Sequence, residues 1–126
     1  MSVLVDSSKW IDYFRGTGQS DILEMLIEEN LAVINDLILA ELVPSLQVKK
    51  ERELVALLRA IKRQPMLIDW NEIIVMQTSC LSQGIIKVGI PDLIIAQNSI
   101  QGGLRLLSRD KHFALIAEYF PLEIYL

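Results

Sequence analysis

The chain has 126 residues, a length typical of one domain and sufficient to bury a core without disulfides. Its net charge of −4 excludes a protein that binds nucleic acid through a general excess of positive charge. It shows no basic signal peptide, no apolar run approaching the ~18 residues of a membrane span, and only one cysteine, Cys80, so we expect a cytoplasmic protein.

In the first half of the chain, short apolar runs alternate with helical patterns. We predict strands over residues 3–5 and 31–34, helices over 8–14, 20–30 and 36–48, and a glycine-containing loop over 15–18. Ser20 or Asp21 should cap the second helix, and Asn35 with Asp36 the third. Pro44 lacks a backbone donor, so it should kink or interrupt that third helix.

The second half continues the alternation. We predict helices over 53–63, 70–83, 93–100 and 111–119, and strands over 66–68, 104–107 and 122–125. The helix over 93–100 is apolar nearly all round and should be buried. The inner face of the helix over 70–83 should consist of Trp70, Ile73, Ile74, Gln77 and Leu81.

Strands that alternate with helices indicate an α/β fold, in which a central parallel sheet lies between helical layers. The chain contains no internal repeat and no linker long enough to separate two domains. We therefore expect a single domain over residues 1–126.

Four acidic residues stand beside apolar sequence. Asp6 ends the first strand, Asp110 follows the strand over 104–107, Asp92 opens the most apolar helix, and Glu41 interrupts an apolar helical run. A charge in such surroundings costs free energy unless it is paired or bound to a cation. Because the carboxyl ends of parallel strands meet at one edge of a sheet, all four carboxylates can converge there.

Four converging carboxylates repel one another, and a divalent cation removes that repulsion. Oxygen ligands of this kind suit Mg²⁺ or Mn²⁺, and such a site fits attack of an activated water on a phosphodiester. Each residue alone has a structural explanation: Asp6 and Asp110 could cap helices, and Asp92 could complement a helix dipole. Glu41 gains nothing from capping in mid-helix, so the convergence of the four favours a functional site.

At these residues the chain resembles the PIN-domain ribonucleases, of the VapC toxin type found in type II toxin–antitoxin systems. The resemblance covers nearly the whole chain, and four motifs carry it: Val3-Leu4-Val5-Asp6-Ser7-Ser8, Asp36-Leu37-Ile38-Leu39-Ala40-Glu41-Leu42, Ile90-Pro91-Asp92-Leu93-Ile94-Ile95-Ala96, and Leu106-Leu107-Ser108-Arg109-Asp110-Lys111-His112-Phe113. It departs from the family pattern at Pro44, Gln97 and Asn98.

The resemblance implies an α/β/α fold with a parallel sheet of four or five strands, and an endoribonuclease that depends on Mg²⁺ or Mn²⁺. By motif position, it implies metal binding by Asp6, Asp92 and Asp110, a pocket completed by Glu41, and a supporting role for Ser108. It also implies a homodimer and a cognate antitoxin, whose C-terminal segment would cover the site.

Rival interpretations remain open at this point. A catalytically silent PIN-like module could bind RNA or a protein, whereas a phosphatase or a phosphoacceptor receiver would require a second acid where Ser8 or Ser7 stands. The basic run over 49–63 could contact RNA or antitoxin, or be a solvated helix face. We expect His112 to face solvent and Trp10 to lie in the core or at a dimer contact.

Overall fold

The computed structural model describes residues 1–17 and 20–126, so Gly18 of the predicted loop and the side chain of Ser20 lie outside the described part. Five parallel strands form one sheet in the order β3-β2-β1-β4-β5. They are β1 (Val3–Val5), β2 (Ala32–Ile34), β3 (Lys62–Arg63), β4 (Arg105–Leu107) and β5 (Glu123–Ile124). The helices are α1 (Ser7–Arg15), α2 (Ser20–Glu28), α3 (Asp36–Val48), α4 (Arg52–Ala60), α5 (Trp70–Ser82), α6 (Ile90–Gln101) and α7 (His112–Ala117).

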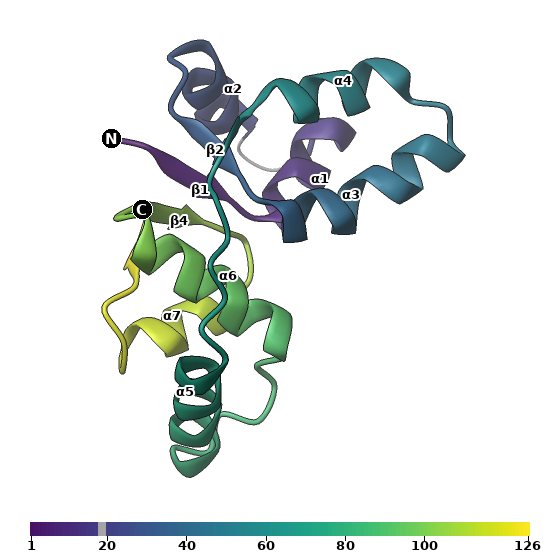
Figure 1. The fold of residues 1–126 in the computed structure, drawn as a ribbon. Helices are drawn as coiled ribbons and strands as arrows, with labels where there is room; N and C mark the ends of the chain where they lie inside the picture. The colour runs from purple at the N-terminus through teal and green to yellow at the C-terminus, as the bar shows by residue number, and fades with distance from the viewer. Residues whose placement is uncertain (18–19) are drawn as a thin grey trace.

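The helices divide into two groups on either side of the sheet (Figure 1). The chain builds outward from β1 through β2 to β3, with α1–α4 on one side. It then returns past β1 and builds β4 and β5 in the other direction, with α5–α7 on the opposite side. This arrangement confirms the predicted α/β fold with a parallel sheet between helical layers. The strand order reverses between the neighbouring strands β1 and β4. Ligands of open α/β sheets bind at such a reversal point.

The core lies along the three central strands. The side chains of β1 and β2 are all buried, and the middle residues of β1 and β4 are paired, Leu4 opposite Leu106. Trp10 of α1 is fully buried and its Nε1 donates a hydrogen bond to the Val5 carbonyl at 3.2 Å, which confirms its predicted place in the core. Residues 93–99 of α6 are buried without exception, again as predicted.

Two predictions at the edge of the sheet are wrong. The helix predicted over 53–63 ends at Ala60, and the strand β3 is Lys62–Arg63 instead of 66–68. Both residues of β3 are exposed and charged, so no apolar pattern marks them as a strand; they are held by parallel pairing with Val33 and Ile34 of β2. Charged residues are typical of an edge strand that must avoid further pairing.

Pro44 does not interrupt α3, which runs from Asp36 to Val48. Pro44 and the residue one turn earlier, Ala40, both lie on the exposed face of the helix. Water can therefore satisfy the Ala40 carbonyl that loses its partner. The predicted cap of this helix is confirmed, because Oδ1 of Asn35 accepts a hydrogen bond from the Ile38 N–H at 2.9 Å.

The prediction for α5 was right about the helix and wrong about its inner face. Asp69 caps the helix by accepting from Glu72 N–H at 3.1 Å. The buried residues, however, are Ile73, Met76 and Cys80. Much of the predicted inner face is instead exposed: Trp70 by 57%, Ile74 by 63% and Leu81 by 53%.

The amides of α6 explain how this helix holds the extended segment before α5. Gln97 bonds both the N–H and the carbonyl of Asp69, each at 3.1 Å, and Asn98 bonds the amide of Asn35 and the carbonyl of Pro65. These two departures from the family pattern are therefore buried structural ties. Among the described residues, no helix is both long and apolar enough to span a membrane.

Candidate active site

The site begins where β1 and β4 end side by side. Val5 pairs with Leu107, and the next residue of each strand is polar, Asp6 and Ser108. Asp6 is 6% exposed, and its N–H donates to the Leu107 carbonyl at 2.9 Å. Its Oδ2 accepts hydrogen bonds from Ser108 at 2.8 Å and from Ser8 at 3.0 Å, so two hydroxyls fix the carboxylate.

Asp6 occupies the cap position of α1 but does not cap the helix with its side chain. The structural explanation that a cap would give is therefore absent for this residue. Asp110 and Asp92 do have such contacts: Asp110 accepts from the His112 N–H at 2.9 Å, and Asp92 accepts from the Gly89 N–H at 3.3 Å. These bonds orient the two carboxylates, and each bonded oxygen, Oδ1 of Asp110 and Oδ2 of Asp92, has a further lone pair.

An ion pair holds the turn after β4 against α1. Nη1 of Arg109 lies 2.7 Å from Oδ1 of Asp12, whose side chain is only 10% exposed. The Arg109 N–H also donates to the Ser8 hydroxyl at 3.1 Å. The turn that carries Ser108 and Asp110 is thus fastened to the helix that follows Asp6. The guanidinium of Arg109 is engaged with Asp12.

Asp92, Asp110 and His112 form a second group next to Asp6. One ligand atom of each lies within 4.8 Å of the others, a spacing that can accommodate one metal ion. Nδ1 of His112 is 3.1 Å from Oδ1 of Asp110 and 3.9 Å from Oδ2 of Asp92. The expectation that His112 faces solvent was therefore wrong. The chain turns back into α7 directly after Asp110, and this turn directs the imidazole toward the acids.

Glu41 reaches the group from α3. Glu41 lies on the exposed face of the helix. Its side chain is therefore not surrounded by the apolar residues that flank it in the sequence. Burial nevertheless raises its pKa above the ordinary 4.5, and the charges of Asp6 and Asp92 raise it further, while a hydrogen bond with Ser7 opposes the shift. This coupling shows that Glu41 lies within electrostatic reach of Asp6 and Asp92.

The pKa of Asp92 is raised from 3.8, first by burial and then by the charges of Asp110 and Asp6; the Gly89 hydrogen bond and His112 act in the opposite sense. The structure therefore brings Asp6, Glu41, Asp92 and Asp110 together at the reversal point of the sheet. Neighbouring acids raise the pKa of Glu41 and of Asp92, and a divalent cation would stabilise such carboxylates in their charged form. The residues present fit such an ion.

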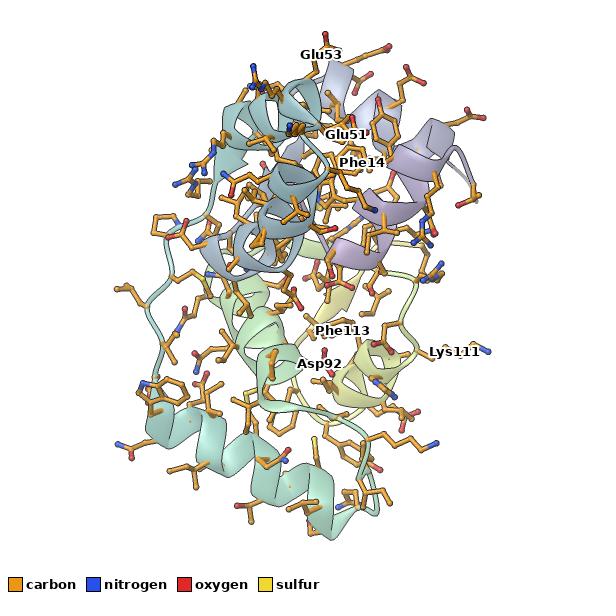
Figure 2. All side chains as sticks on the ribbon, turned by 90° about the vertical axis from the view of Figure 1, so that its right-hand side faces the viewer. Phe14, Glu51, Glu53, Asp92, Lys111 and Phe113 are labelled. Atoms are coloured by element: carbon orange, nitrogen blue, oxygen red, sulfur yellow. The ribbon has the colours of Figure 1, made fainter. Side chains whose placement is uncertain are left out.

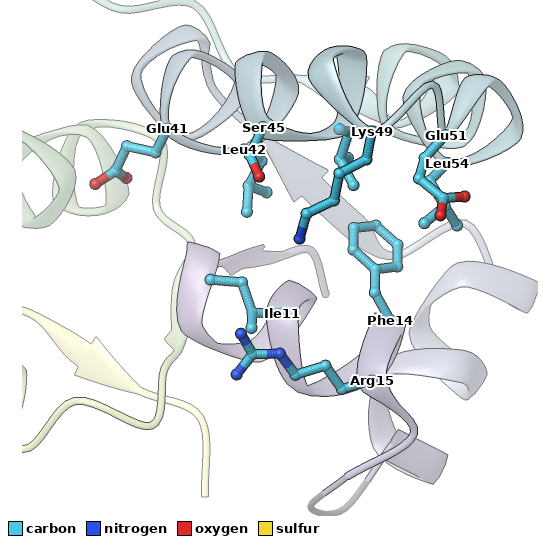
Figure 3. Close-up of a pocket in the computed structure, with 10 residues that line it drawn as sticks. Ile11, Phe14, Arg15, Glu41, Leu42, Ser45, Lys49, Glu51 and Leu54 are labelled. Atoms are coloured by element: carbon cyan, nitrogen blue, oxygen red, sulfur yellow. The ribbon is translucent and has the colours of Figure 1, made fainter.

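A cavity of about 250 Å³ extends from Glu41 along the space between α1 and α3 (Figure 3). Its walls combine apolar residues, such as Phe14 and Leu54, with charged ones: Arg15, Lys49, Glu41 and Glu51. Figure 3 shows Lys49 reaching from α3 toward Phe14 of α1. We call this cavity the α1–α3 groove. Sequence analysis gave no indication of it, because it depends on how far apart two helices pack.

Comparison with known proteins gives a family and a fold. The PIN domain family model matches residues 3–119. No curated protein matches the sequence.

Solved structures share the fold at low identity. VapBC2 from Rickettsia felis, bound to a DNA fragment from its promoter, has a TM-score of 0.74 and 18% identity over 99% of this chain and 98% of that one. FitAcB from Neisseria gonorrhoeae has a TM-score of 0.65 and 15% identity over 98% and 96%. PAE2754 from Pyrobaculum aerophilum has a TM-score of 0.62 and 15% identity over 92% and 84%.

Proposed function

Because the chain belongs to the PIN domain family, we propose that it is a metal-dependent endoribonuclease that hydrolyses RNA phosphodiester bonds. PIN domains are nucleases, and they generally use divalent metals. The observation that supports the assignment is the convergence of Asp6, Glu41, Asp92 and Asp110 where the strand order reverses. We further propose that residues 1–126 act as one domain in the cytoplasm, where RNA is available.

The proposed roles follow from the contacts. Asp6, Asp92 and Asp110 would hold Mg²⁺ or Mn²⁺, which would supply charge to acidify the attacking water and to stabilise the leaving oxygen. Ser108 and Ser8 hold the Asp6 carboxylate in one orientation. Glu41, whose pKa is raised by burial and by the charges of Asp6 and Asp92, would accept the proton of the attacking water.

The test is cleavage of RNA in Mg²⁺ or Mn²⁺ by the purified protein and its Asp6→Asn and Asp92→Asn variants. Both amides keep the shape of the side chain and remove its charge, so we expect a loss of at least about 100-fold in rate with an unchanged fold. Asp36→Asn is the matched control, because Asp36 is exposed and forms only a surface ion pair with Arg63. Cleavage that persisted in both site variants would contradict the assignment.

We also propose that the protein is the toxin of a toxin–antitoxin pair and that the antitoxin occupies the α1–α3 groove. The groove combines apolar side chains with the cations of Arg15 and Lys49 and the acids Glu41 and Glu51, so an extended segment with apolar side chains and charges of both signs fits it. Co-expression with the protein encoded by the neighbouring small reading frame tests this partner. Lys49→Glu should weaken the complex, whereas the equally exposed Lys87→Glu on the other side of the sheet should not.

The proposed homodimer would form through the exposed face of α5. Trp70, Ile74 and Leu81 share this face with Ile90, the first residue of α6, and the residues that line the depression between them carry no charge. A chain with net charge −4 repels its own copies except where neutral surfaces meet. Exposed apolar patches of this kind are typical of contacts between subunits.

The alternative of a catalytically silent module that binds RNA or protein would not need a complete set of acids. All four carboxylates are present, neighbouring acids raise the pKa of Glu41 and of Asp92, and two hydroxyls fix Asp6. For this reason we place the nuclease first.

A further inference from the structure

We propose that His112 binds the divalent ion through Nδ1, and that this nitrogen ligand makes the site prefer Mn²⁺ to Mg²⁺. The proposal rests on the proposed nuclease function in one respect, that an ion binds beside the acids. It adds to Asp92 and Asp110 a protein ligand that is not a carboxylate, and it fixes the class of ion.

The first observation is that Nδ1 of His112 is buried without a hydrogen-bond partner, although the side chain as a whole is 31% exposed. The atom lies 3.1 Å from Oδ1 of Asp110, but the contact is not aligned as a hydrogen bond. Burying a polar atom with its hydrogen-bonding capacity unused costs free energy. A ligand between Nδ1 and the carboxylates would remove that cost.

The second observation is the spacing of the three atoms. For an octahedral ion with ligands at about 2.0–2.1 Å, neighbouring ligand atoms lie ~3.0 Å apart and opposite ones ~4.2 Å apart. Nδ1 of His112 is 3.1 Å from Oδ1 of Asp110 and 3.9 Å from Oδ2 of Asp92. Both distances from Nδ1 fall between these two values, and the three ligand atoms all lie within 4.8 Å of one another, so they can face one ion.

The third observation is that the backbone holds the three ligands in place. Oδ1 of Asp110 accepts from the His112 N–H at 2.9 Å, which ties the two residues into one tight turn. The Asp110 N–H donates to Ser108, and Asp92 accepts from the Gly89 N–H. Ligands fixed by short backbone links lose little conformational freedom when an ion binds, so binding is favoured.

The chemistry of imidazole sets the ion preference. Mg²⁺ favours oxygen ligands and retains its water, whereas first-row transition ions accept neutral imidazole nitrogen readily. With carboxylates alone, the site would discriminate little between Mg²⁺ and Mn²⁺. With His112 in the coordination sphere, Mn²⁺ gains a ligand that Mg²⁺ binds poorly.

Binding of the ion alone tests the proposal without RNA. Pulsed EPR of Mn²⁺ bound to the untagged protein should show coupling to an imidazole ¹⁴N, and this coupling should vanish in His112→Ala. His112 is the only histidine of the chain, so the signal has one possible source. By calorimetry, His112→Ala should lower Mn²⁺ affinity by about tenfold or more and Mg²⁺ affinity by less than about threefold.

Lys111→Ala is the matched control, since Lys111 precedes His112 and its side chain points away from the rest of the chain (Figure 2). It should leave both affinities unchanged. Mn²⁺ binding by the unaltered protein without nitrogen coupling would overturn the role of His112 and leave the proposed nuclease standing. Failure of the unaltered protein to bind either ion would overturn both.

Discussion

Ser108 donates a hydrogen bond of 2.8 Å to Oδ2 of Asp6, although 102 positions separate the two residues in the chain. The bond joins the first residues after β1 and β4, neighbouring parallel strands on either side of the point where the strand order reverses. The same hydroxyl accepts from the Asp110 N–H at 2.9 Å. One small side chain therefore sets the relative position of two of the acids proposed to bind metal.

Removing this hydroxyl should weaken metal binding more than it weakens the fold. We expect Ser108→Ala to lower Mn²⁺ affinity or RNA cleavage by about 10- to 100-fold, because groups that orient a metal ligand have effects of that size. Ser108→Thr keeps the hydroxyl and should retain most of both properties. Calorimetry and a cleavage assay measure the two effects. Equal losses in the alanine and threonine variants would contradict an orienting role.

The ion pair between Arg109 and Asp12 should contribute to stability. Arg109→Ala leaves the Asp12 carboxylate, 10% exposed, without its cation, and the free energy of unfolding should fall by roughly 1 kcal/mol, a modest value because Arg109 itself is 61% exposed. The pair of Arg105 with Glu123 is exposed on both sides, so Arg105→Ala should change stability by less than about 0.5 kcal/mol. Urea denaturation of the two variants makes the comparison.

Without metal, Glu41 and Asp92 should make the protein more stable at mildly acidic pH. The folded protein raises both pKa values above 4.5 and 3.8, so it favours the protonated carboxyls. Their contribution is therefore fully present below those ordinary values and is lost as the pH rises through the raised pKa values. Melting temperatures in a chelator, measured across this range, should depend less on pH in Glu41→Gln and Asp92→Asn.

Mn²⁺ should reverse that dependence, because it binds the deprotonated carboxylates and stabilises the folded state by mass action. Its stabilising effect should grow as the pH rises. The raised pKa values would be contradicted if, without metal, the melting temperature rose with pH and did so equally in the unaltered protein and in both variants.

The exposed face of α5 should carry self-association. Ile74 is 63% exposed at the centre of this face, and Ile74→Glu places a charge where two neutral surfaces would meet. We expect this variant to be monomeric by sedimentation equilibrium under conditions in which the unaltered protein is a dimer. Val48→Glu changes an apolar residue that is 83% exposed on the other side of the sheet and should leave the dimer intact. A dimer that survives Ile74→Glu would assign the contact to another surface.

Elements with strong local signals can be predicted from the residue pattern alone. The buried strands β1 and β2, the caps Asn35 and Asp69, and the buried helix α6 follow from apolar pattern and capping chemistry, which act within a few residues. The residue pattern also predicted Asp6 and Asp92 as site candidates, because a carboxylate that directly follows a buried strand or opens an apolar helix is unusual; Glu41, in contrast, lies on the exposed face of α3.

Which surfaces meet depends on contacts between residues far apart in the chain. The helix α5 carries apolar residues on several sides, and packing against α6 buries Ile73 and Met76 while leaving Ile74 exposed. The strand β3 consists of two exposed charged residues that become a strand only because β2 offers its free edge. His112 turns toward Asp92 and Asp110 because the chain reverses direction after β4. In each case a neighbour distant in sequence determines the conformation, so the local residue pattern could not reveal it.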